Sequence, residues 1–133
     1  MIGNAMKTPL GRVKGLGSSK SGTKHYWQQR VTAVSNIVTM TALLIILFML
    51  MTRDWPAAIV FFGNPLVGLC VILALVSSSY HMWLGMQVVV EDYIHTEGLK
   101  LALLLANTFY AVLLGLAGIY AVIRLGLTGL LAA

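Results

Sequence analysis

The chain has 133 residues, of which 59% are hydrophobic and only 10% are charged, whereas a soluble domain carries about 25% charged residues. This composition excludes an ordinary soluble protein, and because the apolar runs are continuous rather than alternating, it also excludes a β-barrel. The net charge is +5, and the single cysteine, Cys70, excludes an intrachain disulfide or a cysteine-held metal cluster built from this chain alone.

Residues 1–24 form a basic segment rich in glycine and serine, without a helical period, and predict a flexible or partner-ordered cytoplasmic arm. Most of the positive charge precedes the first apolar run, with no acid among it: Lys7, Arg12, Lys14, Lys20, Lys24 and Arg30. Such a cluster is typical of the positive-inside signal of membrane proteins. We therefore predict that the amino terminus is on the cytoplasmic side.

Residues 25–133 are predicted to form an all-α membrane anchor with three transmembrane helices, as part of a larger hetero-oligomeric bundle. The spans are expected at about 31–51, 66–90 and 99–125, each long enough for a hydrocarbon core that needs about 20 residues. Three spans place the two termini on opposite sides, so the polar loop 91–98 is expected on the inner side.

Short breaks separate the first two spans. The stretch "TRDWP" predicts a turn in which Pro56 starts or breaks a helix, and "GNP" at 63–65 precedes the second span. In the third span, Ala111, Gly115 and Gly118 form a small-residue patch that favours close helix packing.

His81 is the residue that most clearly indicates chemistry. It precedes Glu91 by ten residues, which places it about 15 Å from the inner boundary and near the centre of the membrane. An ionisable side chain at that depth is by default a candidate functional site. The alternative is a neutral histidine that only hydrogen-bonds a neighbouring helix.

Small residues surround His81 on the predicted helix. Ser77 and Gly85 are one turn away on the same face, and Ser78 is beside them. These residues would leave a flat slot for a haem, although small residues also simply pack helices closely. His25 and His95 are near the membrane surface, so the second axial ligand would come from another chain.

Asp92 and Tyr93 follow His81 by about three helical turns, so Asp92 returns to nearly the same face at the inner interface. A phenol and a carboxylate there suit a quinone headgroup, whose reduction consumes protons. An interfacial tyrosine with a solvated acid is the common alternative. Arg30, at the start of the first span, suits a haem propionate or, more commonly, a lipid phosphate.

Two stretches, "HYWQQRVTAV" and "HMWLGMQVVVEDYIH", resemble the D-type hydrophobic membrane anchor of succinate dehydrogenase, respiratory complex II. The matching pattern, H-x-W-x-G-M-x-x-x-x-x-D-Y, consists of His81, Trp83, Gly85, Met86, Asp92 and Tyr93. Arg30 matches the arginine that begins the first helix. The arm ending in "SGTKHYWQQR" is similar to the alphaproteobacterial form.

The resemblance implies that His81 supplies one axial ligand to a b-type haem, with a histidine of the C-type cytochrome b anchor as the other. It implies that Tyr93 hydrogen-bonds ubiquinone, that Asp92 supports its protonation, and that Arg30 lies near the haem propionates. FAD and the iron–sulfur clusters would be in a flavoprotein subunit and an iron–sulfur subunit. This chain alone would not oxidise succinate.

The expected location is the bacterial cytoplasmic (inner) membrane, with the mitochondrial inner membrane as the alternative. Three other functions stay open. One is the anchor of a fumarate reductase, and another is a homodimeric haem b protein in which two copies of His81 hold one macrocycle. The third is a small proton-coupled transporter subunit, although no internal repeat is visible.

Overall fold

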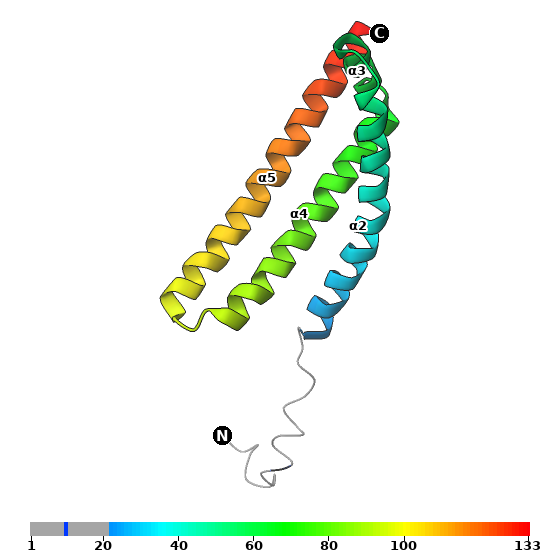
Figure 1. Cartoon of the computed structure of the whole chain (residues 1–133). Coiled ribbons are helices and arrows are strands. Elements are labelled where there is room, and N and C mark those ends of the chain that lie inside the picture. The colour runs from blue at the N-terminus through cyan, green and yellow to red at the C-terminus, as the bar shows by residue number, and fades with distance from the viewer. Residues whose placement is uncertain (1–9, 11–21) are drawn as a thin grey trace, which may run out of the picture.

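The computed structural model describes Leu10 and residues 22–133, and these residues contain helices and no strand. The arm predicted over 1–24 therefore lies almost entirely outside the described residues. The helices are α2 (Gly22–Met51), α3 (Trp55–Phe62), α4 (Pro65–Tyr93) and α5 (Glu97–Ala132). Figure 1 shows α4 between α2 and α5, with the start of α2 and the end of α5 at opposite ends of the bundle.

Three of these helices are long and apolar enough to cross a membrane, which confirms the predicted fold class: Thr23–Met51, Pro65–Tyr93 and Glu97–Ala132. At most 11% of the most apolar window of each helix is buried within the chain. Because so little of this surface is covered, lipid or other protein chains must surround the helices. The side on which the amino terminus lies stays a prediction.

The helices extend beyond the apolar runs that predicted them. Helix α4 begins at Pro65, where Asn64 caps it by accepting a hydrogen bond from the Leu66 backbone N–H at 2.9 Å. It continues through Tyr93, so the connection to α5 is 94–96 and is shorter than the predicted loop 91–98. The predicted span ended at residue 90 because the sequence becomes polar there. The helix continues because acidic residues such as Glu91 and Asp92 are compatible with helical structure.

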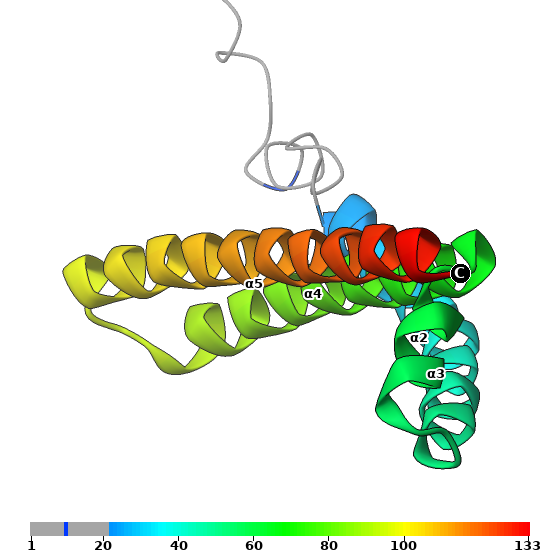
Figure 2. The same cartoon turned by 90° about the horizontal axis from the view of Figure 1, so that it is seen from above.

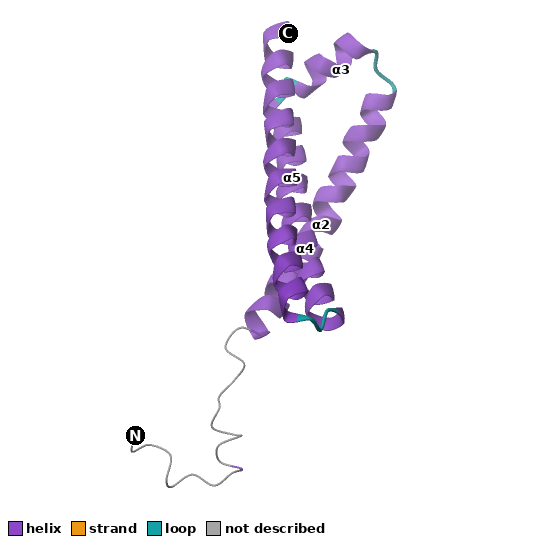
Figure 3. Cartoon of the chain, turned by 90° about the vertical axis from the view of Figure 1, so that its left-hand side faces the viewer, coloured by secondary structure: helices purple, strands orange, loops and turns teal. Residues whose placement is uncertain are grey.

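Helix α3 crosses the end of the bundle, and its start agrees with the prediction that Pro56 starts or breaks a helix. Asp54 caps it, since its Oδ1 accepts a hydrogen bond from the Ala57 backbone N–H at 3.3 Å, and Pro56 is in its first turn. Helix α2 separates from α4 and α5 toward this end, and α3 bridges the resulting gap to α5 (Figures 2 and 3).

Glycines allow α3 and α5 to meet backbone to backbone. A Cβ atom added at Gly63 would lie 2.6 Å from the carbonyl carbon of Gly129, closer than real Cβ contacts allow. One added at Gly129 would overlap the Ile59 carbonyl oxygen and would lie 2.5 Å from the Gly63 nitrogen. Glycine at both positions therefore permits the contact that anchors α3.

The small-residue patch of the third span packs against α4, as predicted. Ala111 and Gly115 are buried. A Cβ atom at Gly115 would be 3.5 Å from Ser79 Oγ, and one at Gly118 would be 3.0 Å from a methyl carbon of Leu75. The absence of larger side chains thus brings α5 close to α4 along this stretch.

Candidate functional site

His81 lies on α4 and meets α2 inside the membrane-spanning part of the bundle. Its Nδ1 atom is 2.9 Å from the hydroxyl oxygen of Thr32. One helical turn away, the Ser77 hydroxyl donates a hydrogen bond to Ser35 Oγ at 3.0 Å. The two contacts form a polar seam between α2 and α4, which we call the α2–α4 seam and define by Thr32, Ser35, Ser77 and His81.

Gly85 continues the same face of α4 by one more turn. A Cβ atom there would be 3.9 Å from Gln29 Nε2 on α2, which is ordinary van der Waals contact. Ser77, His81 and Gly85 therefore do share one helix face, and this face is directed at α2. Close packing against α2 is sufficient to explain why Ser77 and Gly85 are small. Their predicted role in forming a slot for a haem stays a prediction.

Ser78 belongs to a different face. Its hydroxyl donates to the Ala74 carbonyl oxygen at 2.7 Å, and the side chain lines a groove between α4 and α5. The rest of that groove consists of Leu75, Ser79, Met82, Leu114, Ala117 and Gly118. The structure therefore does not bring Ser78 to the α2–α4 seam, because each residue turns a helix by about 100°.

The donor set at His81 fits a single axial ligand. Within residues 22–133, no three His, Cys, Asp or Glu side chains come together. His25 is in the first turn of α2 and His95 in the connection 94–96, away from the level of His81. With Nδ1 held by Thr32, no described residue hydrogen-bonds the other ring nitrogen, Nε2, which suits a metal-binding imidazole.

Asp92 and Tyr93 form the last turn of α4 and are exposed, Tyr93 to 76%. The ammonium group of Lys100 on α5 donates to the Glu91 carbonyl oxygen at 2.9 Å, a common way to cap the carboxyl end of a helix. This contact brings a positive charge to the end of α4 that carries Asp92 and Tyr93. The phenol and the carboxylate are thus open to a ligand or to solvent.

Arg30 is exposed near the start of α2, and its guanidinium carbon lies 4.9 Å from the centre of the Tyr26 ring. This cation–π contact directs the charge toward the start of the helix. In Figure 1 the start of α2 and the end of α4 lie at the same end of the bundle. Arg30 is therefore at the end that carries Asp92 and Tyr93.

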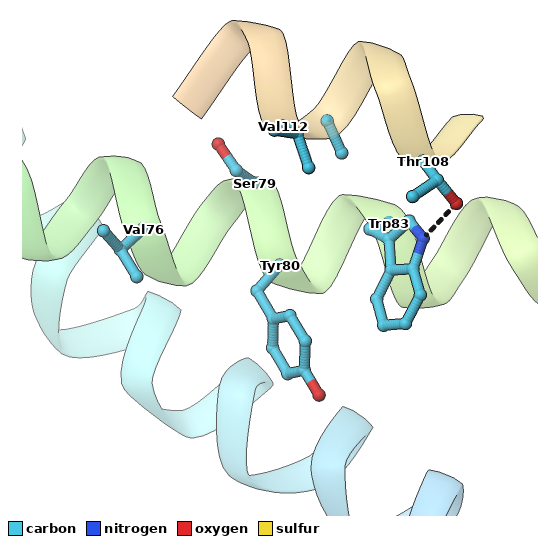
Figure 4. Close-up of a pocket in the computed structure, with 7 residues that line it drawn as sticks. Val76, Ser79, Tyr80, Trp83, Thr108 and Val112 are labelled. Carbon is cyan, nitrogen blue, oxygen red and sulfur yellow. Dashed lines mark hydrogen bonds between the residues drawn. The ribbon is translucent and has the colours of Figure 1, made fainter. Parts of the chain in front are cut away.

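Trp83 fastens α4 to α5. Its indole N–H donates to Thr108 Oγ1 at 3.0 Å, as the dashed line in Figure 4 marks, and the Asn107 amide donates to the Trp83 carbonyl oxygen at 3.0 Å. The Tyr80 ring stacks on Trp83 with ring centroids 5.5 Å apart and projects to the α2 side of the helix. Within the described residues, Trp83 therefore packs α4 against α5.

An apolar cavity of about 340 Å³ adjoins Trp83 between α4 and α5. Its lining is Val76, Ser79, Tyr80, Trp83, Thr108, Ala111 and Val112. The partners Thr32, Asn107 and Thr108 were not predicted as site residues. Their only signal in the sequence was polarity inside an apolar span, which indicates a helix contact but does not name the partner.

Comparison with known proteins identifies the family. The family described as "Succinate dehydrogenase/Fumarate reductase transmembrane subunit" matches residues 4–115. A succinate dehydrogenase hydrophobic membrane anchor subunit of Rickettsia bellii is 34% identical over 117 residues, covering 86% of this chain and 92% of the relative. No solved structure matches the chain at a significant level.

A subunit of the same name from Paracoccus denitrificans is 29% identical over 121 residues, covering 90% of this chain and 92% of the relative. One from Rickettsia typhi is 31% identical over 118 residues, covering 87% and 93%. These relatives are alphaproteobacterial, which agrees with the resemblance of the basic arm. With its three membrane-spanning helices, the chain belongs to the transmembrane subunit family of succinate dehydrogenases and fumarate reductases.

Proposed function

We propose that this chain is a membrane anchor subunit of a succinate:ubiquinone oxidoreductase in the bacterial inner membrane. The single observation that carries the proposal is His81, held through Nδ1 by Thr32 inside a membrane span, with Nε2 free of hydrogen bonds to any described residue. A histidine so placed is suited to a metal ligand. The names of the similar proteins support the succinate dehydrogenase assignment over the other functions.

His81 would hold a b-type haem through Nε2, together with a histidine of the C-type anchor. A bound haem of this kind supplies one-electron storage within the membrane. The chain's own contribution is a ligand that is oriented by α2. Arg30 carries a positive charge that suits a propionate at the end of the bundle where α2 begins.

Tyr93 and Asp92 would serve ubiquinone at the end of α4. Their exposure leaves the phenol free to donate a hydrogen bond to a quinone carbonyl, and the carboxylate free to take protons from the aqueous side and pass them on. The Lys100 ammonium group, fixed on the Glu91 carbonyl, adds positive charge at the same corner. This charge would favour the anionic stages of quinone reduction.

The exposed apolar surface of the chain supports the presence of partner subunits. The large hydrophobic side chains of all three long helices are mostly exposed in the isolated chain, so a C-type anchor can cover part of them. The flavoprotein and iron–sulfur subunits, with FAD and the clusters, would bind on the inner side. This chain would then form the electron-accepting end of the complex and would not oxidise succinate itself.

The test is an optical difference spectrum of the complex purified in mild detergent through a tag on this chain. We expect a b-type haem signal that succinate reduces, and we expect replacement of His81 by alanine to remove or alter it. A wild-type complex that oxidises succinate but contains no haem would refute the haem role. An unaltered haem in the His81→Ala complex would refute His81 as ligand.

An anchor of a fumarate reductase is the second candidate, since the family description names both enzymes. The two are distinguished by comparing succinate oxidation coupled to ubiquinone with fumarate reduction by a low-potential quinol. We expect the first rate to be the larger. The reverse ratio would favour the fumarate reductase.

A further inference from the structure

Thr32 makes more contacts than its single hydroxyl hydrogen can serve. Its oxygen lies 2.8 Å from the Gln28 carbonyl oxygen, 3.1 Å from the Gln29 carbonyl oxygen and 2.9 Å from His81 Nδ1. A hydroxyl has one hydrogen to donate and two lone pairs to accept with, whereas a carbonyl oxygen can only accept. The single Thr32 hydrogen can serve only one of these three atoms, and the Gln28 carbonyl oxygen is the nearest of them.

With the Thr32 hydrogen on the Gln28 carbonyl, the hydrogen between Thr32 and His81 comes from the imidazole. When the Thr32 hydrogen points at Gln28, the Thr32 oxygen presents a lone pair to His81, and Nδ1–H donates to it. A neutral imidazole with its hydrogen on Nδ1 carries its lone pair on Nε2. The geometry of α2 thus selects one tautomer of a histidine on α4.

We propose that Thr32 is a positioning residue that sets the tautomer and the ring orientation of His81, so that Nε2 faces the iron of a bound haem. The inference rests on the proposed role of His81 as a haem ligand. Thr32 itself touches neither the iron nor the quinone and acts only through the imidazole. This role resembles the outer hydrogen bond that most metal-binding histidines make.

The surroundings make this hydrogen bond hard to replace. Both side chains are half-buried and lie in membrane-spanning helices, where a polar group without a partner is costly because no water is available. Among the described residues, Thr32 is the only side chain that hydrogen-bonds His81. Removing the hydroxyl therefore leaves Nδ1–H without its acceptor.

The proposal predicts the direction in which the midpoint potential of the haem changes when the hydroxyl of Thr32 is removed. An Nδ1–H that donates a hydrogen bond makes Nε2 a stronger donor to the metal, and a stronger donor stabilises the ferric over the ferrous state. Replacing Thr32 by valine keeps the shape but removes the acceptor. The haem midpoint potential should then move to a more positive value, and the low-spin ferric spectrum should change.

The chain offers a matched control in the same seam. Ser35 is one turn from Thr32 on α2 and bonds Ser77, not His81. Replacing Ser35 by alanine removes an interhelical hydrogen bond of comparable length from the same helix pair. It therefore reports what loss of seam packing alone does to the haem, while Thr32→Ser retains the hydroxyl and should restore the wild-type signal.

The experiment measures haem content, the ferric low-spin resonance and a redox titration on the intact purified complex. We expect a positive shift of potential or loss of haem in Thr32→Val, with Thr32→Ser and Ser35→Ala close to wild type. An unchanged potential and spectrum in Thr32→Val with full haem content would overturn the proposal, as would equal changes in Thr32→Val and Ser35→Ala.

The His81→Ala variant distinguishes an error in the proposed role of His81 from an error in the proposed role of Thr32. If the wild-type complex lacks haem, or if His81→Ala retains the wild-type haem spectrum, the role of His81 itself is wrong and the proposal for Thr32 is wrong with it. If His81→Ala loses the haem while Thr32→Val leaves it unaltered, His81 is the ligand and only the positioning role of Thr32 is refuted.

Discussion

The close contact between α3 and α5 predicts that adding one methyl group there lowers the stability of the chain. Replacing Gly129 by alanine adds a methyl group that would overlap the Ile59 carbonyl oxygen and would lie 2.5 Å from the nitrogen and 2.9 Å from the Cα of Gly63. All these atoms belong to the backbone, so no side-chain rotation can relieve the overlap. Helix α3 must move away from α5 as a unit.

The magnitude follows from two opposing effects. Forcing an extra methyl group into a packed contact costs about 1–3 kcal/mol, and the upper part of this range applies where only backbone can move. Alanine in a helix is favoured over glycine by about 1 kcal/mol. We therefore expect Gly129→Ala to lower the free energy of unfolding by about 1–2 kcal/mol.

Gly68 provides the matched control. It is also helical, but an added Cβ atom has no heavy atom within 4 Å, so Gly68→Ala should be neutral or stabilising by up to about 1 kcal/mol. The assay is reversible unfolding of the chain in mixed detergent micelles, followed by circular dichroism. If both variants unfold at the same detergent composition, the close approach of α3 and α5 does not contribute to stability and the reasoning is wrong.

Three further experiments test the quinone site, the contact between α4 and α5, and the orientation of the chain in the membrane. Tyr93→Phe should slow ubiquinone reduction while leaving succinate oxidation by an artificial acceptor mostly intact, and unchanged quinone kinetics would refute the role of the phenol. Trp83→Phe removes the indole donor to α5 and should cost about 0.6 kcal/mol and at most about 1.7 kcal/mol, measured in the same unfolding assay; a larger loss would indicate a packing defect instead. In a Cys70→Ala background, an impermeant thiol reagent applied to the periplasmic side should label a cysteine at Asp54 but not one at Glu97, and the opposite pattern would reverse the predicted topology.

Much of the fold could be predicted because membrane helices depend on local properties. A span in lipid must satisfy its own backbone hydrogen bonds, so a continuous apolar run of sufficient length predicts a helix wherever it occurs. The predicted spans 31–51, 66–90 and 99–125 all lie within α2, α4 and α5. For α3 the sequence indicated only that Pro56 starts or breaks a helix, because its eight residues are too few to span and its capping by Asp54 depends on a turn whose form the composition does not specify.

The candidate site could be predicted only to the level of a helix face. The helical period placed Ser77, His81 and Gly85 on one side of α4, and the expected depth of His81, counted from Glu91, stays a prediction. Both inferences use positions along one helix. The roles of Tyr93 and Asp92 toward a quinone and of Arg30 toward a haem stay predictions.

The class of the protein, its three spans and the small residues around His81 could be read from the amino-acid sequence, because they depend on composition and on the period of a single helix. The tertiary structure was needed to show that this histidine faces α2, that its Nδ1 lies 2.9 Å from the Thr32 hydroxyl oxygen, that Ser78 turns toward α5, and that Gly63 meets Gly129. The contact between Thr32 and His81, for example, joins residues 49 positions apart. Such contacts arise from the fit between whole helix surfaces, which no local pattern encodes.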